Sequence, residues 1–142
     1  MRRLILTALP ALMLPAMSMA EPPNPAVDAM EGYLMFADYH AGIIMPTQLP
    51  PEEWGNVTFV DVRDADQFAD GHIRDAINIE WRELLGRRDE LPTDRPVVVY
   101  CNSGSLSAQI GFALRVAGMT NVRILQGGLN DWQATHGNAG VE

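Results

Sequence analysis

The chain has 142 residues, of which 47% are hydrophobic and 20% are charged, a composition typical of one domain with a buried core. It contains ten arginines, no lysine and eighteen acidic residues, so its net charge at pH 7 is −8. This acidic balance argues against nucleic acid and anionic membranes as partners, because both would repel the surface.

The first twenty residues have the three parts of a secretory signal peptide. Residues 2–3 are arginines, residues 4–14 form a short apolar stretch, and residues 18–20 (Ser-Met-Ala) place small side chains at a cleavage site. The apolar stretch is shorter than the about 20 residues of a membrane-spanning helix. We therefore expect export to the periplasm, cleavage after Ala20, and a mature chain that starts at Glu21 and has no membrane segment. An uncleaved anchor is the alternative.

Residues 21–42 form an extension ahead of the domain. Its proline-rich start ends in Asn24 and Pro25, a typical helix beginning with Asn as the cap and Pro in the first turn. Apolar residues then recur at helical spacing, which predicts an amphipathic helix over residues 26–40. We interpret its apolar stripe as packing against the domain; a docking surface for a partner protein is the alternative.

Residues 43–137 alternate between short apolar strands and helices, and residues 138–142 are left as a tail. The predicted strands span residues 57–60, 76–79, 97–100 and 122–125, with a shorter candidate strand at 43–45. The predicted helical segments span residues 48–54, 65–70, 81–86, 105–117 and 129–135. This alternation is typical of an open parallel sheet with helices on both faces, so the predicted fold class is α/β.

The only cysteine of the chain, Cys101, follows the apolar strand at residues 97–100. In open α/β sheets, ligands bind at this carboxyl edge of the strands. A lone cysteine cannot form an internal disulfide, and a buried inert thiol is the structural interpretation of such a residue. Its position at the edge of the sheet favours a reactive thiol instead.

The residues after Cys101 are small and polar, and they lead directly into a predicted helix. They are Asn102, Ser103, Gly104, Ser105, Leu106 and Ser107. Such a loop can curl so that successive backbone N–H groups converge on the sulfur, and the following helix adds its positive N-terminal end. Both effects favour a thiolate, and the same amides would stabilise a persulfide anion. The pattern predicts a nucleophilic cysteine with a substrate-binding loop.

Three stretches, in chain order, resemble the rhodanese-like (sulfurtransferase) family. They are DVR at 61–63 with QF at 67–68 and GHI at 71–73, then YCNSG at 100–104, and then VRILQGG at 122–128 with Trp132. The resemblance covers residues 43–136 and implies a five-stranded parallel sheet. It also implies that Cys101 is the nucleophile that forms a persulfide, surrounded by the amides of residues 102–106.

The chain departs from the family pattern at three positions. An acid is more usual where Gln67 stands, arginine is frequent at Asn102, and Arg, Thr or Ser is frequent at Leu106. A loop without cations loses charge-assisted hydrogen bonds to thiosulfate, each of them contributing about 1.5–3 kcal/mol. We therefore expect weak activity with thiosulfate, and we expect arginine introduced at position 102 or 106 to improve it.

Together with the predicted export, the resemblance implies a periplasmic sulfurtransferase that needs no cofactor. It would move sulfane sulfur from a small anion such as thiosulfate, from polysulfide or from a persulfide donor to cyanide or a thiol, through a persulfide on Cys101. Because the chain has no second cysteine, the acceptor must be an external thiol or a partner protein. A sulfur carrier and a non-catalytic binding module on the same scaffold are the alternatives.

Other residues at the sheet edge fit supporting roles. We expect Asp61 to hold turn amides and Arg63 to form an internal ion pair beneath the loop, and we interpret His72 as structural. Trp81 and Arg82 follow a strand and are candidates to line the pocket, where Arg82 would supply a cation.

Two other kinds of site are excluded by the pattern. A cysteine phosphatase needs arginine six positions after its cysteine to stabilise the transferred phosphate, and Ser107 stands there. The three histidines lie far apart without ligand spacing, so no metal site is expected.

Overall fold

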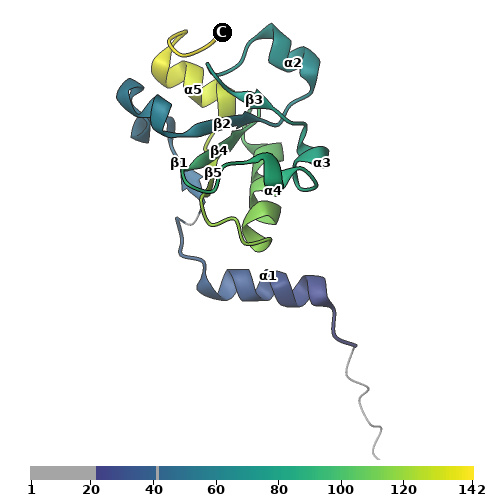
Figure 1. The fold of residues 1–142 in the computed structure, drawn as a ribbon. Helices are drawn as coiled ribbons and strands as arrows, with labels where there is room; N and C mark the ends of the chain where they lie inside the picture. The colour runs from purple at the N-terminus through teal and green to yellow at the C-terminus, as the bar shows by residue number, and fades with distance from the viewer. Residues whose placement is uncertain (1–21, 41) are drawn as a thin grey trace, which may run out of the picture.

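The computed structural model describes residues 22–40 and 42–142, which form an α/β domain preceded by a separate helix (Figure 1). The predicted signal peptide and its cleavage site lie outside the described residues. The helix α1 spans Pro25–Phe36, with the Asn24 side chain accepting a hydrogen bond from the Ala26 amide and Pro25 in the first turn. It ends before the predicted residue 40, because the backbone is extended at Ala37.

The domain contains a five-stranded parallel sheet, which confirms the predicted fold class. The strands are β1 (Ile43–Ile44), β2 (Thr58–Asp61), β3 (Ile77–Asn78), β4 (Val97–Tyr100) and β5 (Val122–Leu125). Their order across the sheet is β1-β5-β4-β2-β3, and every pairing is parallel. The strand β4, which ends at Tyr100 directly before Cys101, is therefore the central one.

Three strands differ from the prediction by one residue, and the first of them, β1, ends at Ile44 rather than at residue 45. The strand β3 is shorter than the predicted segment 76–79, and β2 begins and ends one residue later than predicted. Asp61 is therefore the last residue of β2, paired with Tyr100 and Asn78. This register brings Asp61 beside the end of β4, at the edge where the cysteine loop begins.

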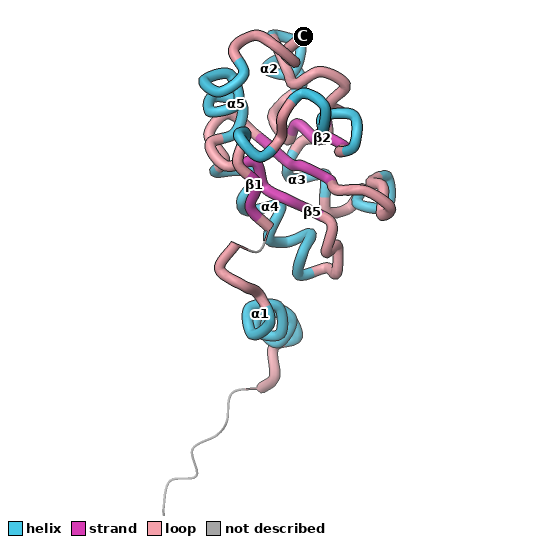
Figure 2. Tube along the Cα trace, turned by 90° about the vertical axis from the view of Figure 1, so that its left-hand side faces the viewer, coloured by secondary structure: helices cyan, strands magenta, loops and turns pink. Residues whose placement is uncertain are grey.

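Helices cover both faces of the sheet (Figure 2). They are α2 (Ala65–Asp70), α3 (Trp81–Leu84), α4 (Ser105–Val116) and α5 (Gly128–His136), with 3-10 turns at Pro46–Gln48, Pro51–Asn56 and Arg88–Glu90. Successive residues of a strand point to opposite faces. Val97 and Val99 accordingly belong to a buried cluster with side chains of α3 and α4, whereas Val98 and Tyr100 pack in a second cluster with Trp132 of α5.

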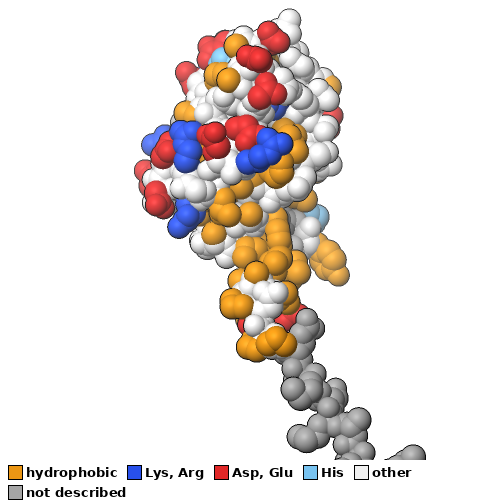
Figure 3. Space-filling model, turned by 90° about the vertical axis from the view of Figure 1, so that its right-hand side faces the viewer, with side chains coloured by type: hydrophobic (Ala, Val, Ile, Leu, Met, Phe, Trp, Pro, Cys, Tyr) orange, Lys and Arg blue, Asp and Glu red, His pale blue; other side chains and the backbone are white. Residues whose placement is uncertain are grey.

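The helix α1 touches the domain only lightly among the contacts of the described residues. Tyr33 packs edge-to-face on Phe112 of α4, and its hydroxyl accepts a hydrogen bond of 2.9 Å from Arg115. No residue of α1 is buried, and Met35 and Phe36 are 75% and 86% exposed. Figure 3 shows hydrophobic side chains gathered over this helix and the adjoining surface of the domain. None of the helices in residues 22–40 and 42–142 has the length and apolar character needed to cross a membrane.

The last residues of the chain, grouped as a tail in the sequence analysis, pair with the segment after α2. Val141 forms an antiparallel bridge with Ile73, and the backbones of Glu142 and His72 exchange two hydrogen bonds. The Glu142 carboxylate also lies 3.6 Å from the His72 ring. Residues 140–142 are thus part of the folded domain.

Candidate active site

Cys101 directly follows the central strand β4, at the start of the segment that joins this strand to helix α4. Its side chain is 3% exposed, and its sulfur accepts a hydrogen bond of 3.2 Å from the Gly104 amide. Gly104 has a φ of 96°, a conformation that favours glycine, and this lets the chain turn into α4 with its amide directed at the sulfur. The hydroxyl of the buried Ser107 lies 3.7 Å from Sγ and 3.1 Å from the Gly104 carbonyl oxygen.

These contacts favour the thiolate form of Cys101. Burial alone would raise the pKa of the thiol, since a charge is less stable away from water. Hydrogen bonds from the Ser107 backbone and hydroxyl, and from the amides of Ser103 and Leu106, act in the opposite direction and prevail. The pKa of Cys101 is therefore lowered below its ordinary value. A thiolate is the nucleophilic form of cysteine.

The N-terminus of α5 holds the other side of the loop. The amides of Leu129 and Asn130 donate to the carbonyl oxygens of Cys101 and Asn102 at 2.8 and 3.0 Å. Gly128 makes this approach possible: its φ is 59°, and a Cβ there would collide with the backbone of Cys101 and Asn102. With two carbonyls turned toward α5, the amides that follow are free to face the sulfur.

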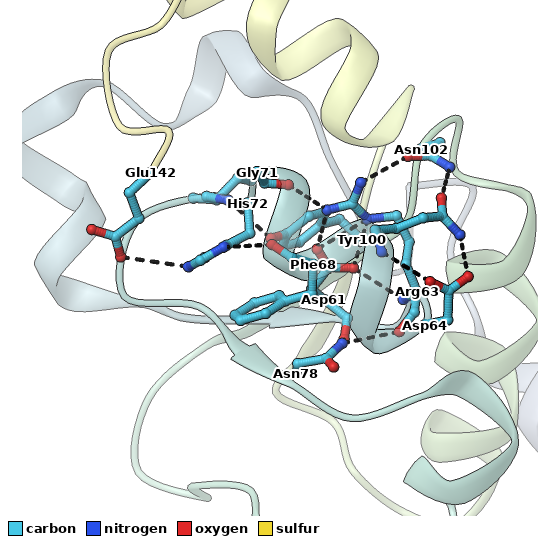
Figure 4. Close-up of polar contacts among 12 residues, drawn as sticks. Asp61, Arg63, Asp64, Phe68, Gly71, His72, Asn78, Tyr100, Asn102 and Glu142 are labelled. Carbon is cyan, nitrogen blue, oxygen red and sulfur yellow. Dashed lines mark hydrogen bonds and ion pairs between the residues drawn. The ribbon is translucent and has the colours of Figure 1, made fainter.

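Asp61 and Arg63 form a buried ion pair beneath the loop (Figure 4). The side chains of Arg63 and Asp61 are 6% and 0% exposed, and Nη2 lies 2.6 Å from Oδ2. Arg63 also donates to the Gly71 carbonyl at 2.7 Å and to the Asn102 side chain at 3.0 Å. The Asn78 amide closes the network by donating to the carbonyl oxygens of Asp61 and Arg63. The pair thus ties β2, α2 and the cysteine loop together.

The side chain of Asn102 is turned toward α2. Its oxygen accepts from Arg63, and its Nδ2 donates to Gln67 Oε1 at 2.6 Å. An arginine in the same orientation would face the guanidinium of Arg63. The gain in thiosulfate activity expected from arginine at position 102 stays a prediction, and it requires that the arginine side chain point toward the sulfur rather than toward α2.

The remaining predicted edge residues take part in contacts of their own. Arg82 pairs with Glu80 at 2.8 Å and lies over the Trp81 ring at 5.0 Å, so its charge is compensated. His72 stacks on Phe68 with ring centroids 3.7 Å apart and contacts the Phe68 carbonyl through Nδ1. Both contacts of His72 stabilise the turn after α2. Within the described part of the chain, no group of three or more His, Cys, Asp or Glu side chains is arranged to hold a metal ion.

Comparison with known proteins identifies this arrangement. A family profile described as "Rhodanese-like domain" matches residues 50–135. The chain belongs to the rhodanese-like family. A rhodanese-like domain from Anabaena, solved in solution, superposes with a TM-score of 0.62 at 31% identity, covering 71% of this chain and 78% of that one.

Two bacterial relatives show how far the similarity of this rhodanese-like chain extends. A protein of Allochromatium vinosum named "Sulfurtransferase" is 39% identical over 82 residues, which cover 58% of this chain and 76% of that protein. The Bacillus subtilis protein YqhL is 38% identical over 73 residues. The match spans 58% of the length of YqhL and 51% of this chain. These relatives support a sulfurtransferase-like family in general.

Sequence reasoning did not anticipate two parts of the rhodanese-like site. Gln67 was noted only as a departure from the family pattern, yet it contacts the first loop residue from a position 35 residues earlier in the chain. Gly128 was noted only as the end of the VRILQGG stretch, yet it packs directly against the backbone of Cys101 and Asn102. The adjacent pair of glycines at the end of β5 was the signal for a close backbone approach.

Proposed function

We propose that the chain is a periplasmic sulfurtransferase that carries sulfane sulfur as a persulfide on Cys101. The observation that carries this proposal is the position of Sγ, which lies at the carboxyl edge of the sheet and receives the Gly104 amide and the Ser107 hydroxyl. Hydrogen bonds of this kind stabilise the thiolate before the reaction and the persulfide anion after it.

The transfer occurs in two displacements. The thiolate of Cys101 attacks the outer sulfur of the donor, a new S–S bond forms, and the bond to the rest of the donor breaks. The electron pair of that bond leaves with sulfite from thiosulfate, or with a thiolate from a persulfide. In the second step, the thiolate of an external acceptor attacks the outer sulfur and Cys101 leaves as a thiolate. Cyanide in the same role would leave as thiocyanate.

The mass of the intact protein tests this proposal directly. Treatment with a persulfide or thiosulfate donor should add about 32 Da, one sulfur atom, and cyanide or an external thiol should remove it. The Cys101→Ser variant should fold and show neither step, because the change is small and lies at the edge of the sheet. If no donor adds sulfur to the wild-type protein, the sulfurtransferase proposal is wrong.

A non-catalytic binding module is the second candidate, favoured by the exposed apolar residues of α1 such as Met35 and Phe36. This role would not require the thiol. A partner that binds the Cys101→Ser protein as tightly as the wild type, together with no sulfur added to the wild type, would favour it.

A further inference from the structure

The first residue of the cysteine loop is held by a line of hydrogen bonds that ends in an acid. Arg63 donates to Asn102 Oδ1 at 3.0 Å, Asn102 donates to Gln67 Oε1 at 2.6 Å, and Gln67 donates to Asp64 Oδ2 at 2.5 Å. The line thus starts at a buried guanidinium, passes through two neutral amides, and ends at an exposed carboxylate.

The positive charges near this line are already compensated. Arg63 is paired with Asp61 in the protein interior, and Arg82 is paired with Glu80. None of the loop residues 102–107 is cationic. Asp64, by contrast, has no cation among the hydrogen bonds and ion pairs of the described residues, and its pKa is lowered by hydrogen bonds from the backbone and side chain of Gln67. A donor approaching on the α2 side therefore meets a negative charge.

We propose that the neutral Gln67–Asn102 contact, with Asp64 behind it, makes the site select singly charged sulfur donors such as organic persulfides over doubly charged thiosulfate. This inference rests on the sulfurtransferase function proposed above. A dianion is repelled about twice as strongly as a monoanion by the thiolate and by Asp64, because the Coulomb energy scales with the product of the charges. Neither the loop residues 102–107 nor the α2 residues 65–70 include a cation that could offset that repulsion through a charge-assisted hydrogen bond.

Two donors that differ by one charge separate this effect from other features of the substrate. Thiosulfate is a dianion that releases sulfite, and methanethiosulfonate is a monoanion that releases methanesulfinate. In both, the thiolate of Cys101 attacks the terminal sulfur, and the electron pair of the broken S–S bond leaves with the oxidised sulfur. The wild-type protein should form persulfide from methanethiosulfonate with a kcat/KM at least about tenfold higher than from thiosulfate at low salt.

The dependence of these rates on potassium chloride concentration is a second test on the unmodified chain. Salt screens repulsion between like charges, so both rates should rise, and the thiosulfate rate should rise about twice as steeply in logarithmic terms. A thiosulfate rate that falls with salt would indicate a cationic site and overturn the inference.

A pair of variants on α2 locates the effect at Gln67. Gln67→Arg places a cation against Asn102 and beside Asp64, whereas Ala69→Arg makes the same change in net charge at an exposed position of the same helix. Gln67→Arg should lower the KM for thiosulfate about tenfold, as expected for a charge-assisted contact made on binding. Ala69→Arg should lower this KM by about twofold or less.

Equal effects of the two arginine variants on the ratio of the two donors would overturn the inference, as would a wild-type preference for thiosulfate. Thermal unfolding of both variants checks that they fold, and the salt dependence stands even if one of them does not. A different failure is diagnostic of the function itself. If neither donor adds sulfur to wild-type Cys101, the sulfurtransferase proposal is wrong. If both donors add sulfur equally fast, the sulfurtransferase proposal stands and only the donor selectivity is overturned.

Discussion

At the scale of single residues, Ser107 is the side chain whose hydroxyl reaches the sulfur. It is fully buried, and its hydroxyl has two acceptors within reach, the Gly104 carbonyl at 3.1 Å and Cys101 Sγ at 3.7 Å. A hydroxyl rotates to suit its acceptor. When Cys101 ionises, donation to the sulfur becomes the stronger of the two interactions, because hydrogen bonds to charged groups are stronger.

Ser107→Ala should therefore raise the pKa of Cys101. The thiolate is the reactive form, so the alkylation rate of the wild type should rise with pH and level off below the about 8.5 of a free thiol. In Ser107→Ala the plateau should move to higher pH, because one hydrogen bond to the charged form of Cys101 is lost. Ser105→Ala is the matched control, since the Ser105 hydroxyl contacts that of Ser103. A profile unchanged by Ser107→Ala would contradict the role given to the hydroxyl.

At the scale of elements, the cysteine loop is shaped by the two helices that flank it. The start of α4 provides amides to the sulfur, and the start of α5 takes the carbonyl oxygens of Cys101 and Asn102. The close approach of α5 depends on Gly128, which has no side chain to keep the backbones apart. Loop geometry and thiol reactivity should therefore change together when α5 is displaced.

Gly128→Ala should destabilise the fold by about 2–4 kcal/mol and slow alkylation of Cys101, because it combines a strained backbone with a collision against the loop. Gly118→Ala is the matched control: its φ is 97°, but a Cβ there meets nothing within 4 Å. It should cost about 1 kcal/mol and leave alkylation unchanged. Denaturant unfolding and thiol alkylation measure the two effects. If Cys101 is alkylated as fast in Gly128→Ala as in Gly118→Ala, the close contact of α5 with the cysteine loop does not control the reactivity of the thiol.

Tyr33 holds the helix α1 to α4 through its edge-to-face contact with Phe112, the hydrogen bond from Arg115 and the Arg115 guanidinium over its ring. Tyr33→Ala should therefore release α1 without unfolding the domain. Amide hydrogen exchange should accelerate across residues 25–36 by about tenfold or more, while β4 and β5 keep their protection. Phe36→Ala, which removes an 86% exposed side chain of the same helix, is the comparison and should have little effect. Loss of protection in β4 would show that α1 is instead integral to the core.

The sequence predicts individual elements better than it predicts which elements meet. The strand at residues 97–100, the helix after it and the position of Cys101 at the edge of the sheet follow from local patterns of apolar, small and polar residues. The contacts of Gln67 with Asn102, of Gly128 with the cysteine loop and of Glu142 with His72 join segments far apart in the chain. Local propensity carries no information about such pairs, so they emerge only from the folded structure.

At the scale of the whole molecule, the domain begins some twenty residues after the proposed cleavage site. The chain is proposed to be exported and cut between Ala20 and Glu21. N-terminal sequencing of protein from the periplasmic fraction should therefore start at Glu21. Ala20→Arg, which removes a small residue from the cleavage site, should block processing and leave the longer form. Full-length protein recovered from the cytoplasm would contradict the proposal.

The order of strands in the sheet also determines when the molecule can finish folding. The strand β1 is the first to be synthesised, but its neighbour is β5, the last strand of the chain. Among the strands of residues 22–40 and 42–142, none that is synthesised before β5 pairs with β1, so β1 stays unpaired until residues 122–125 have left the ribosome. Pairings between such distant segments form slowly. The leader proposed for residues 1–20 would then still be attached to an incompletely folded chain, the state in which a general secretory channel can thread it.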